Sequence, residues 1–180
     1  MKTTIAGLTT LLLLAPLALY ADHDDDDEHE RGRGARAGRA AVLPPSEGLT
    51  QYRAECGSCH LAYPPGMLPA RSWSRILEGL GDHFGENAEL SPAAVASLTD
   101  WLRKNAAESG THPRSKKVLK SAQGTTPLRI SELRFIQREH AELAAAVWQR
   151  PAVKTVANCG ACHLDAEQWS FSEHRIEIPR

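Results

Sequence analysis

The sequence predicts a mainly α-helical protein built from two consecutive, dissimilar helical modules. Apolar residues recur three and four positions apart in residues 69–85, 91–106 and 131–149, which is the spacing of one buried helix face. Ser91 followed by Pro92 is a typical helix start. With 180 residues, 42% hydrophobic and a net charge of −1, the composition excludes collagen-like, coiled-coil and multi-span membrane proteins. The balanced charge also gives no excess of positive charge of the kind that nucleic-acid-binding proteins carry.

The N-terminal segment predicts export. Residues 1–21 combine Lys2, an apolar run and small residues at its end, which is the pattern of a secretory signal peptide. A single membrane anchor is the alternative, but the run is short for a bilayer span. Residues 22–43 are acidic and then Arg/Gly-rich, with few apolar side chains, so we expect a disordered tether. A metal site at its histidines, His23 and His29, is less favoured.

Two copies of C-x-x-C-H contain every cysteine of the chain. They are CGSCH at residues 56–60 and CGACH at residues 159–163. Positions i, i+3 and i+4 share one face of a helical turn, so two thiols can bond the vinyl groups of a haem while the imidazole reaches its iron from the same side. The motifs therefore predict two covalent c-type haems, with proximal ligands His60 and His163 and with attachment at Cys56, Cys59, Cys159 and Cys162.

Three other chemistries use the same residues and fit less well. Four-cysteine zinc modules separate their pairs by about 15–20 residues, whereas roughly a hundred residues intervene here. A thioredoxin-like dithiol needs a strand before the motif and a βαβ context, which the sequence does not suggest. Disulfides within each pair would close strained two-residue gaps. None of these alternatives explains a histidine directly after both pairs.

The remaining histidines supply candidates for the second axial position of each iron. His83 continues the apolar stripe of residues 69–85, and His140 lies on the stripe of residues 131–149. A histidine on an apolar face is more often a core residue, but each iron needs a strong donor and softer donors are scarce. We therefore expect His83 and His140 to be distal ligands. Three other side chains are less favoured: the loop residues Met67 and His112, and His174 as the reserve ligand for either iron.

The first haem module is expected over residues 44–108. A helix over residues 47–60 leads into the first motif, and a loop, a ligand-bearing helix and a closing helix follow. Residues 109–127 contain Gly, Ser and Pro without a convincing periodicity, which favours a solvated linker. Basic residues outnumber acids from Arg103 to Arg129, and this strip could instead dock an acidic partner or haem propionates.

The second module, residues 128–180, has a different order. Its ligand-bearing helix precedes the motif, and few residues follow the motif, so the two modules are not tandem copies. A body of this size cannot bury much core alone. We therefore expect haem to serve as its core, the module to dock on the first one, and the haem-free region to be unfolded.

Similarity to a known family is carried by AECGSCHLAYPPGMLPARSW, GDHFGENA, FIQREHAEL, ANCGACHLDAE and IEIPR. Together these segments resemble the periplasmic dihaem cytochrome c family over about residues 50–180, apart from the linker. The resemblance implies a class I cytochrome c-like haem domain followed by a small, irregular α-helical second haem domain. It also implies low-potential, bis-histidine irons, with His83 and His140 as distal ligands. The chain departs from the family in its acidic tail and in His174.

The motifs and the resemblance predict a periplasmic one-electron transfer protein rather than an enzyme. We expect a monomer, and the resemblance implies a small oxygen-binding monohaem cytochrome c and a membrane b-type cytochrome as redox partners. Two alternatives stay open. One is the dihaem subunit of a periplasmic oxidoreductase such as nitrate reductase. The other is a peroxidase or gas-binding protein, which would need one open iron position.

Overall fold

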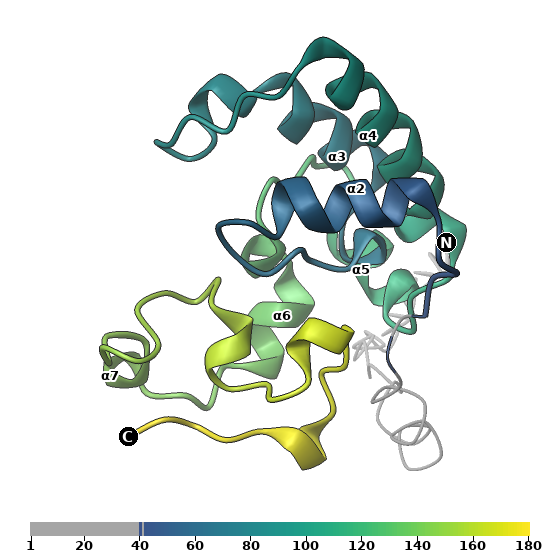
Figure 1. The fold of residues 1–180 in the computed structure, drawn as a ribbon. Helices are drawn as coiled ribbons and strands as arrows, with labels where there is room; N and C mark the ends of the chain where they lie inside the picture. Colours follow the sequence, from purple (N-terminus) through teal and green to yellow (C-terminus); the bar gives the residue numbers. More distant parts are fainter. Residues whose placement is uncertain (1–39, 41) are drawn as a thin grey trace, which may run out of the picture.

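The computed structural model describes residue 40 and residues 42–180. Its α-helices follow one another as α2 (Glu47–Cys56), α3 (Ala70–Glu78), α4 (Pro92–Asn105), α5 (Ser115–Ser121), α6 (Arg134–Glu139) and α7 (Ala145–Trp148) (Figure 1). These described residues form no strand, only isolated bridges, so the predicted mainly helical fold is confirmed. None of the described helices is long and apolar enough to cross a membrane. The expected signal peptide and the tail up to residue 39 lie outside the described residues.

Serine caps set the start of α2 and of α4. Ser46 Oγ accepts the N–H of Leu49 at 3.2 Å, and Ser91 Oγ accepts the N–H of Ala94 at 3.3 Å. Pro92 occupies the first turn of α4, where its missing N–H has no partner to lose. The predicted closing helix is therefore confirmed.

Two other predicted helices end early, and glycines explain both ends. α2 ends at Cys56 rather than at residue 60. The residue after Cys56 is Gly57, whose N–H donates to the carbonyl of Arg53 and closes the last turn. α3 ends at Glu78 rather than near residue 85, because glycines 79 and 81 disfavour a helix interior. The short turn Leu80–Asp82 follows, so His83 lies beyond the helix in a loop. In Figure 1 this loop projects at the upper left, above the turn that follows α2.

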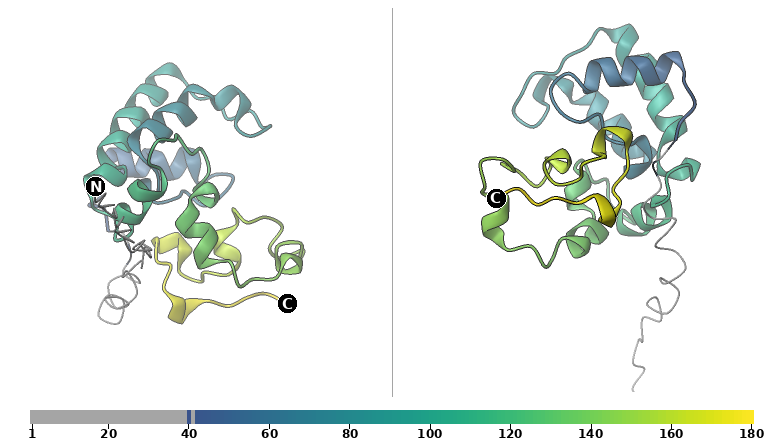
Figure 2. Two further views of the ribbon diagram at one scale, coloured as in Figure 1. Left: turned by 180° about the vertical axis from the view of Figure 1, so that it is seen from behind. Right: turned by 60° about the horizontal axis from the view of Figure 1, so that its bottom comes forward.

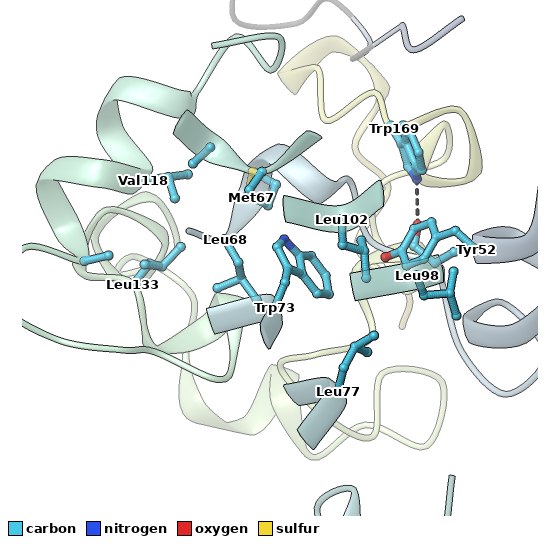
Figure 3. Packing of buried hydrophobic residues seen from close by; sticks show 14 of the residues in the cluster. Tyr52, Met67, Leu68, Trp73, Leu77, Leu98, Leu102, Val118, Leu133 and Trp169 are labelled. Carbon is cyan, nitrogen blue, oxygen red and sulfur yellow. Dashed lines mark hydrogen bonds between the residues drawn. The ribbon is translucent and has the colours of Figure 1, made fainter. Parts of the chain in front are cut away.

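The main hydrophobic core lies where α2, α3 and α4 pack together (Figure 3). Tyr52 of α2 is 1% exposed, and its ring centroid lies 6.1 Å from that of Trp73 on α3. Leu98 and Leu102 of α4 are fully buried in the same cluster. We call residues 42–127 the N-terminal region and residues 128–180 the C-terminal region; most of this core belongs to the former.

Residues 109–127 correct the prediction of a solvated linker. They contain α5, on which Ser115 and Val118 are buried, and Ala122 directly after it is buried as well. This helix packs on two 3-10 turns of the N-terminal region, Pro65–Met67 and Ala107–Ser109, and on α6. A helix of seven residues shows too few apolar repeats for its period to be recognised in the sequence.

The single helix predicted over residues 131–149 is also corrected, because the structure divides it into α6 and α7. The break lies at His140, whose backbone has φ −115° and ψ 8°. In a continuous helix the N–H of His140 would donate to the carbonyl of Ile136. Here the imidazole Nδ1 lies 2.8 Å from that oxygen instead. The side chain has replaced the backbone donor, which ends the helix.

Hydrogen bonds to the residues after the first motif dock the C-terminal region on the N-terminal region. The indole N–H of Trp169 donates to the carbonyl of Ala62 at 2.6 Å (Figure 3), and the hydroxyl of Tyr63 donates to the carbonyl of Ala157 at 2.7 Å. The Arg53 guanidinium lies 4.9 Å from the centroid of the Trp169 ring. Figure 2 shows the C-terminal region on one side of the helical N-terminal region in both views. The expected docking is therefore present.

Candidate haem-binding sites

Two histidine pairs form in the structure, and each joins one C-x-x-C-H motif to one expected distal histidine. The ring centroids of His60 and His83 are 6.1 Å apart, with 16° between the ring planes. Those of His140 and His163 are also 6.1 Å apart, with 75° between the planes. Bonds from a metal to an imidazole nitrogen are about 2 Å long, so two imidazoles on one iron hold their centroids about 6.3 Å apart. Both pairs have the spacing of axial ligands to a single iron.

The first pair is oriented by local backbone contacts. His60 follows the turn after α2, and its Nδ1 lies 2.8 Å from the carbonyl oxygen of Leu61. Nδ1 therefore carries the proton and donates it to this carbonyl, which leaves the lone pair of Nε2 for a metal.

His83 is held by a tight turn formed by DHFG. Its N–H donates to the carbonyl of Glu86 at 2.7 Å, and the N–H of Gly85 donates to Asp82 Oδ1 at 3.0 Å. Phe84 has a φ of 60°, an uncommon conformation for a bulky side chain. Burial, His60 and Arg129 lower the pKa of His83. They favour the neutral imidazole, which is the form that binds a metal.

The second pair lies among aromatic rings in the C-terminal region. The Trp148 ring lies 5.9 Å from His140, and the Phe171 ring lies 5.4 Å from His163. The contact of His140 Nδ1 with the Ile136 carbonyl again leaves Nε2 for a metal. His163 Nδ1 is buried without a hydrogen-bond partner. Unlike His60 and His140, this ring therefore has no hydrogen bond at Nδ1 that fixes its tautomer.

The cysteines of both motifs are free thiols in this structure. Burial, as the largest cause, raises the pKa of Cys56 and of Cys159 to about 11. Zinc binding and dithiol redox chemistry both use the thiolate, whose formation a high pKa opposes. Among the described residues no three His, Cys, Asp or Glu side chains form a group that could hold a metal ion. The arrangement favours thioether attachment of haem over zinc binding and over dithiol redox chemistry.

The less favoured candidates take no part in the two histidine pairs. Met67 is 5% exposed and belongs to the hydrophobic core. His112 is 4% exposed; its Nδ1 accepts the N–H of Arg114 at 3.1 Å, and burial, more than the nearby Arg114, lowers its pKa to about 4. His174 is exposed on the turn Glu173–Arg175, and His163 faces His140 instead.

Two residues near the sites were not predicted as site residues. The Tyr63 ring lies 5.2 Å from His60, and its hydroxyl bonds the carbonyl of Ala157, two residues before Cys159. Burial, together with the nearby Cys159, raises the pKa of Tyr63 to about 12, so its hydroxyl remains a donor. The Arg129 guanidinium lies 3.8 Å from the centroid of the Phe84 ring. Both contacts join residues distant in the chain, and of the two only Arg129 belongs to a stretch with a sequence signal, the basic strip from Arg103 to Arg129.

Comparisons with known proteins point in one direction. Residues 52–171 match the family model described as dihaem cytochrome c. A solved diheme cytochrome c from Rhodobacter sphaeroides is 38% identical with a TM-score of 0.62, and the match covers 74% of this chain and 100% of that one. A diheme cytochrome type c from Shewanella baltica OS155 is 33% identical with a TM-score of 0.61, and the match covers 76% of this chain and 95% of that one. No curated protein matches the chain.

Proposed function

This chain belongs to the dihaem cytochrome c family, and we propose that it is a periplasmic electron carrier with two bis-histidine haems. Membership implies two covalently bound haem c groups and haem-based electron transfer. The haems supply a one-electron iron couple, whose potential the protein sets through axial ligands, hydrogen bonds and burial.

The proposal assigns a role to each residue of the two sites. Cys56 and Cys59 attach the first haem, and Cys159 and Cys162 attach the second. The axial pairs are His60 with His83, and His163 with His140. The observation that carries this assignment is the 6.1 Å spacing in both pairs, reached by residues from unrelated parts of the fold.

Hydrogen bonds at Nδ1 support a low reduction potential. His60 donates to the carbonyl of Leu61, and His140 donates to the carbonyl of Ile136, both at 2.8 Å. Such a bond fixes the ring orientation and makes Nε2 a stronger donor. A stronger donor favours Fe(III), and histidine on both sides lowers the potential relative to a methionine ligand.

Filled axial positions separate a carrier from a peroxidase or a gas-binding protein. With histidine on both sides of each iron, neither a peroxide nor a gas molecule finds an open position. We expect the dithionite-reduced protein to bind no carbon monoxide at neutral pH, as followed by its Soret spectrum. Prompt binding of one carbon monoxide per protein would overturn the carrier proposal.

Location and partners follow from the family resemblance and from the signal-like sequence of residues 1–21. We propose export to the periplasm, a monomeric state, and redox partners of the small monohaem and membrane b-type cytochrome classes. A dihaem subunit of a larger oxidoreductase would instead co-purify with a catalytic chain. Size-exclusion chromatography of periplasmic extract, followed by haem absorbance, distinguishes the two.

A further inference from the structure

A positively charged groove runs along the outer side of α3. It has a volume of about 590 Å³, and the residues that line it include Arg71 and Arg75 of α3 and Arg103 of α4. Glu78 is the one acid among its lining residues. The whole chain has a net charge of −1, so this positive charge is a local feature of the surface.

Two of the three arginines present their charge to solvent. Arg71 donates to the backbone carbonyls of Ala122 and Thr125, which holds that segment against α3. Arg103 is exposed, and the side chain of Arg75 is 66% exposed. Arg75 lies 3.4 Å from the exposed Glu78, and such a pair is weak enough to open for another anion.

The groove is connected to the first histidine pair through two consecutive residues, Leu128 and Arg129. Leu128 lines it, and the next residue, Arg129, places its guanidinium over the ring of Phe84. Phe84 follows His83 directly and is 44% exposed, although its left-handed backbone is unfavourable for a bulky side chain. Exposed strain of this kind concentrates at functional sites.

We propose that this arginine surface, comprising Arg71, Arg75, Phe84, Arg103 and Arg129, docks an acidic redox protein at the first haem site. The inference rests on the proposed carrier function and adds the place and the charge of its partner. Opposite charges steer two proteins together, and a small interface lets them separate after one electron has passed. Phe84, over whose ring the Arg129 guanidinium lies, is the member of this surface that adjoins His83.

The test uses reduced plant-type ferredoxin, a small acidic one-electron donor, as the probe. One electron leaves its iron–sulfur cluster, and one haem iron of the holoprotein goes from Fe(III) to Fe(II). Stopped-flow absorbance compares wild type with the double variant Arg75→Glu/Arg103→Glu. The matched control, Arg134→Glu/Arg138→Glu, reverses two exposed charges on α6. Dithionite reduction and the haem spectrum establish that each variant retains both haems.

At low salt, we expect the groove variant to slow the second-order rate about tenfold and the α6 variant to change it less than about twofold. The second-order rate of the wild type should also fall as the salt concentration rises, and the rate of the groove variant should fall much less. Equal effects of both variants, or a rate independent of salt, would overturn the docking surface. Deletion of the acidic residues 22–30 tests whether the chain's own tail binds the groove. If this deletion raises the rate while the groove variant leaves it unchanged, the proposal of a docking surface for a partner is overturned. Carbon monoxide binding overturns the carrier function separately.

Discussion

The two histidine pairs share one ring spacing, but the regions that hold them are built differently. The first pair stands beside a packed core to which α2, α3 and α4 contribute buried aromatic and leucine side chains. The second pair lies among two short helices and 3-10 turns, where Val147 and Val153 are buried outside that core. The same ring spacing is thus found beside a large hydrophobic core in the N-terminal region and among short helices and turns in the C-terminal region. We therefore expect haem to contribute more to folding in the C-terminal region than in the N-terminal region.

Exposed apolar side chains support the same conclusion. Val156, Leu164, Ile176 and Ile178 are each between 41% and 49% exposed, and all belong to the C-terminal region. Val156 and Leu164 flank the second motif, and Ile176 forms an isolated bridge with His163. We expect a bound haem to cover part of this surface, which would give the region the apolar burial it lacks.

The largest effect should come from removing the second haem. In the variant Cys159→Ala/Cys162→Ala, we expect amides of residues 128–180 to lose most of their protection from hydrogen exchange, because that region has little core of its own. Amides of α2 and α4 should keep theirs. Mass spectrometry of peptides from the holoprotein and the variant measures both. Retained protection across residues 128–180 would show that the C-terminal region keeps its fold without the second haem.

Acid should weaken the N-terminal region through His112. Its folded-state pKa of about 4 lies below the ordinary value of 6.5, so below pH 6.5 the unfolded chain binds a proton that the folded protein does not. The contribution of His112 to the free energy of unfolding is therefore fully present above pH 6.5. It is lost between pH 6.5 and 4, by about 3 kcal/mol in total. Guanidinium unfolding at several pH values measures the fall. The variant His112→Gln should flatten this pH dependence, and an unchanged slope would contradict the assignment.

A smaller effect tests the contact that docks the two regions. The change Trp169→Phe removes the indole N–H and leaves the carbonyl of Ala62 without its partner, at a cost of about 1–3 kcal/mol. We expect hydrogen exchange to rise mainly in the C-terminal region. The matched control is Trp73→Phe, which removes an equivalent bond to the carbonyl of Pro65 within the N-terminal region. The two variants should differ in where exchange rises; identical patterns would show that the docking bond has no local effect.

The smallest effect is expected for Tyr63→Phe. It keeps the ring beside His60 but removes the hydroxyl that bonds Ala157, which should cost about 0.5–1.5 kcal/mol. Tyr52→Phe is the control, because its hydroxyl bonds the carbonyl of Tyr63 inside the N-terminal region. Denaturant unfolding followed at the haem bands compares them. Only Tyr63→Phe should loosen the C-terminal region before the rest; a single shared transition for both would count against a bridging role.

The features that could be predicted from the sequence depend on residues close together in the chain. The helical fold, the start of α4 and the two haem-attachment motifs follow from short-range patterns of caps, apolar spacing and C-x-x-C-H. The expected approach of His83 to His60 and of His140 to His163 is also found, although neither distal histidine lies inside a helix.

The differences arise where tertiary contacts or side chains override those patterns. The imidazole of His140 takes the carbonyl that would have continued the predicted helix. α5 is stabilised by packing on turns of the N-terminal region and on α6, which its own seven residues do not encode. Tyr63, Trp169 and Arg129 act through contacts with distant parts of the chain, so a local reading of the sequence does not reveal them.

Low-temperature electron paramagnetic resonance of the oxidised holoprotein reports whether both irons are bis-histidine. We expect two low-spin signals: an ordinary rhombic one from the near-parallel pair at 16°, and a more anisotropic one from the near-perpendicular pair at 75°. His83→Ala should convert only the first signal to high spin, and His140→Ala only the second. A high-spin iron in the wild type, or a variant that keeps both signals low-spin, would contradict the account.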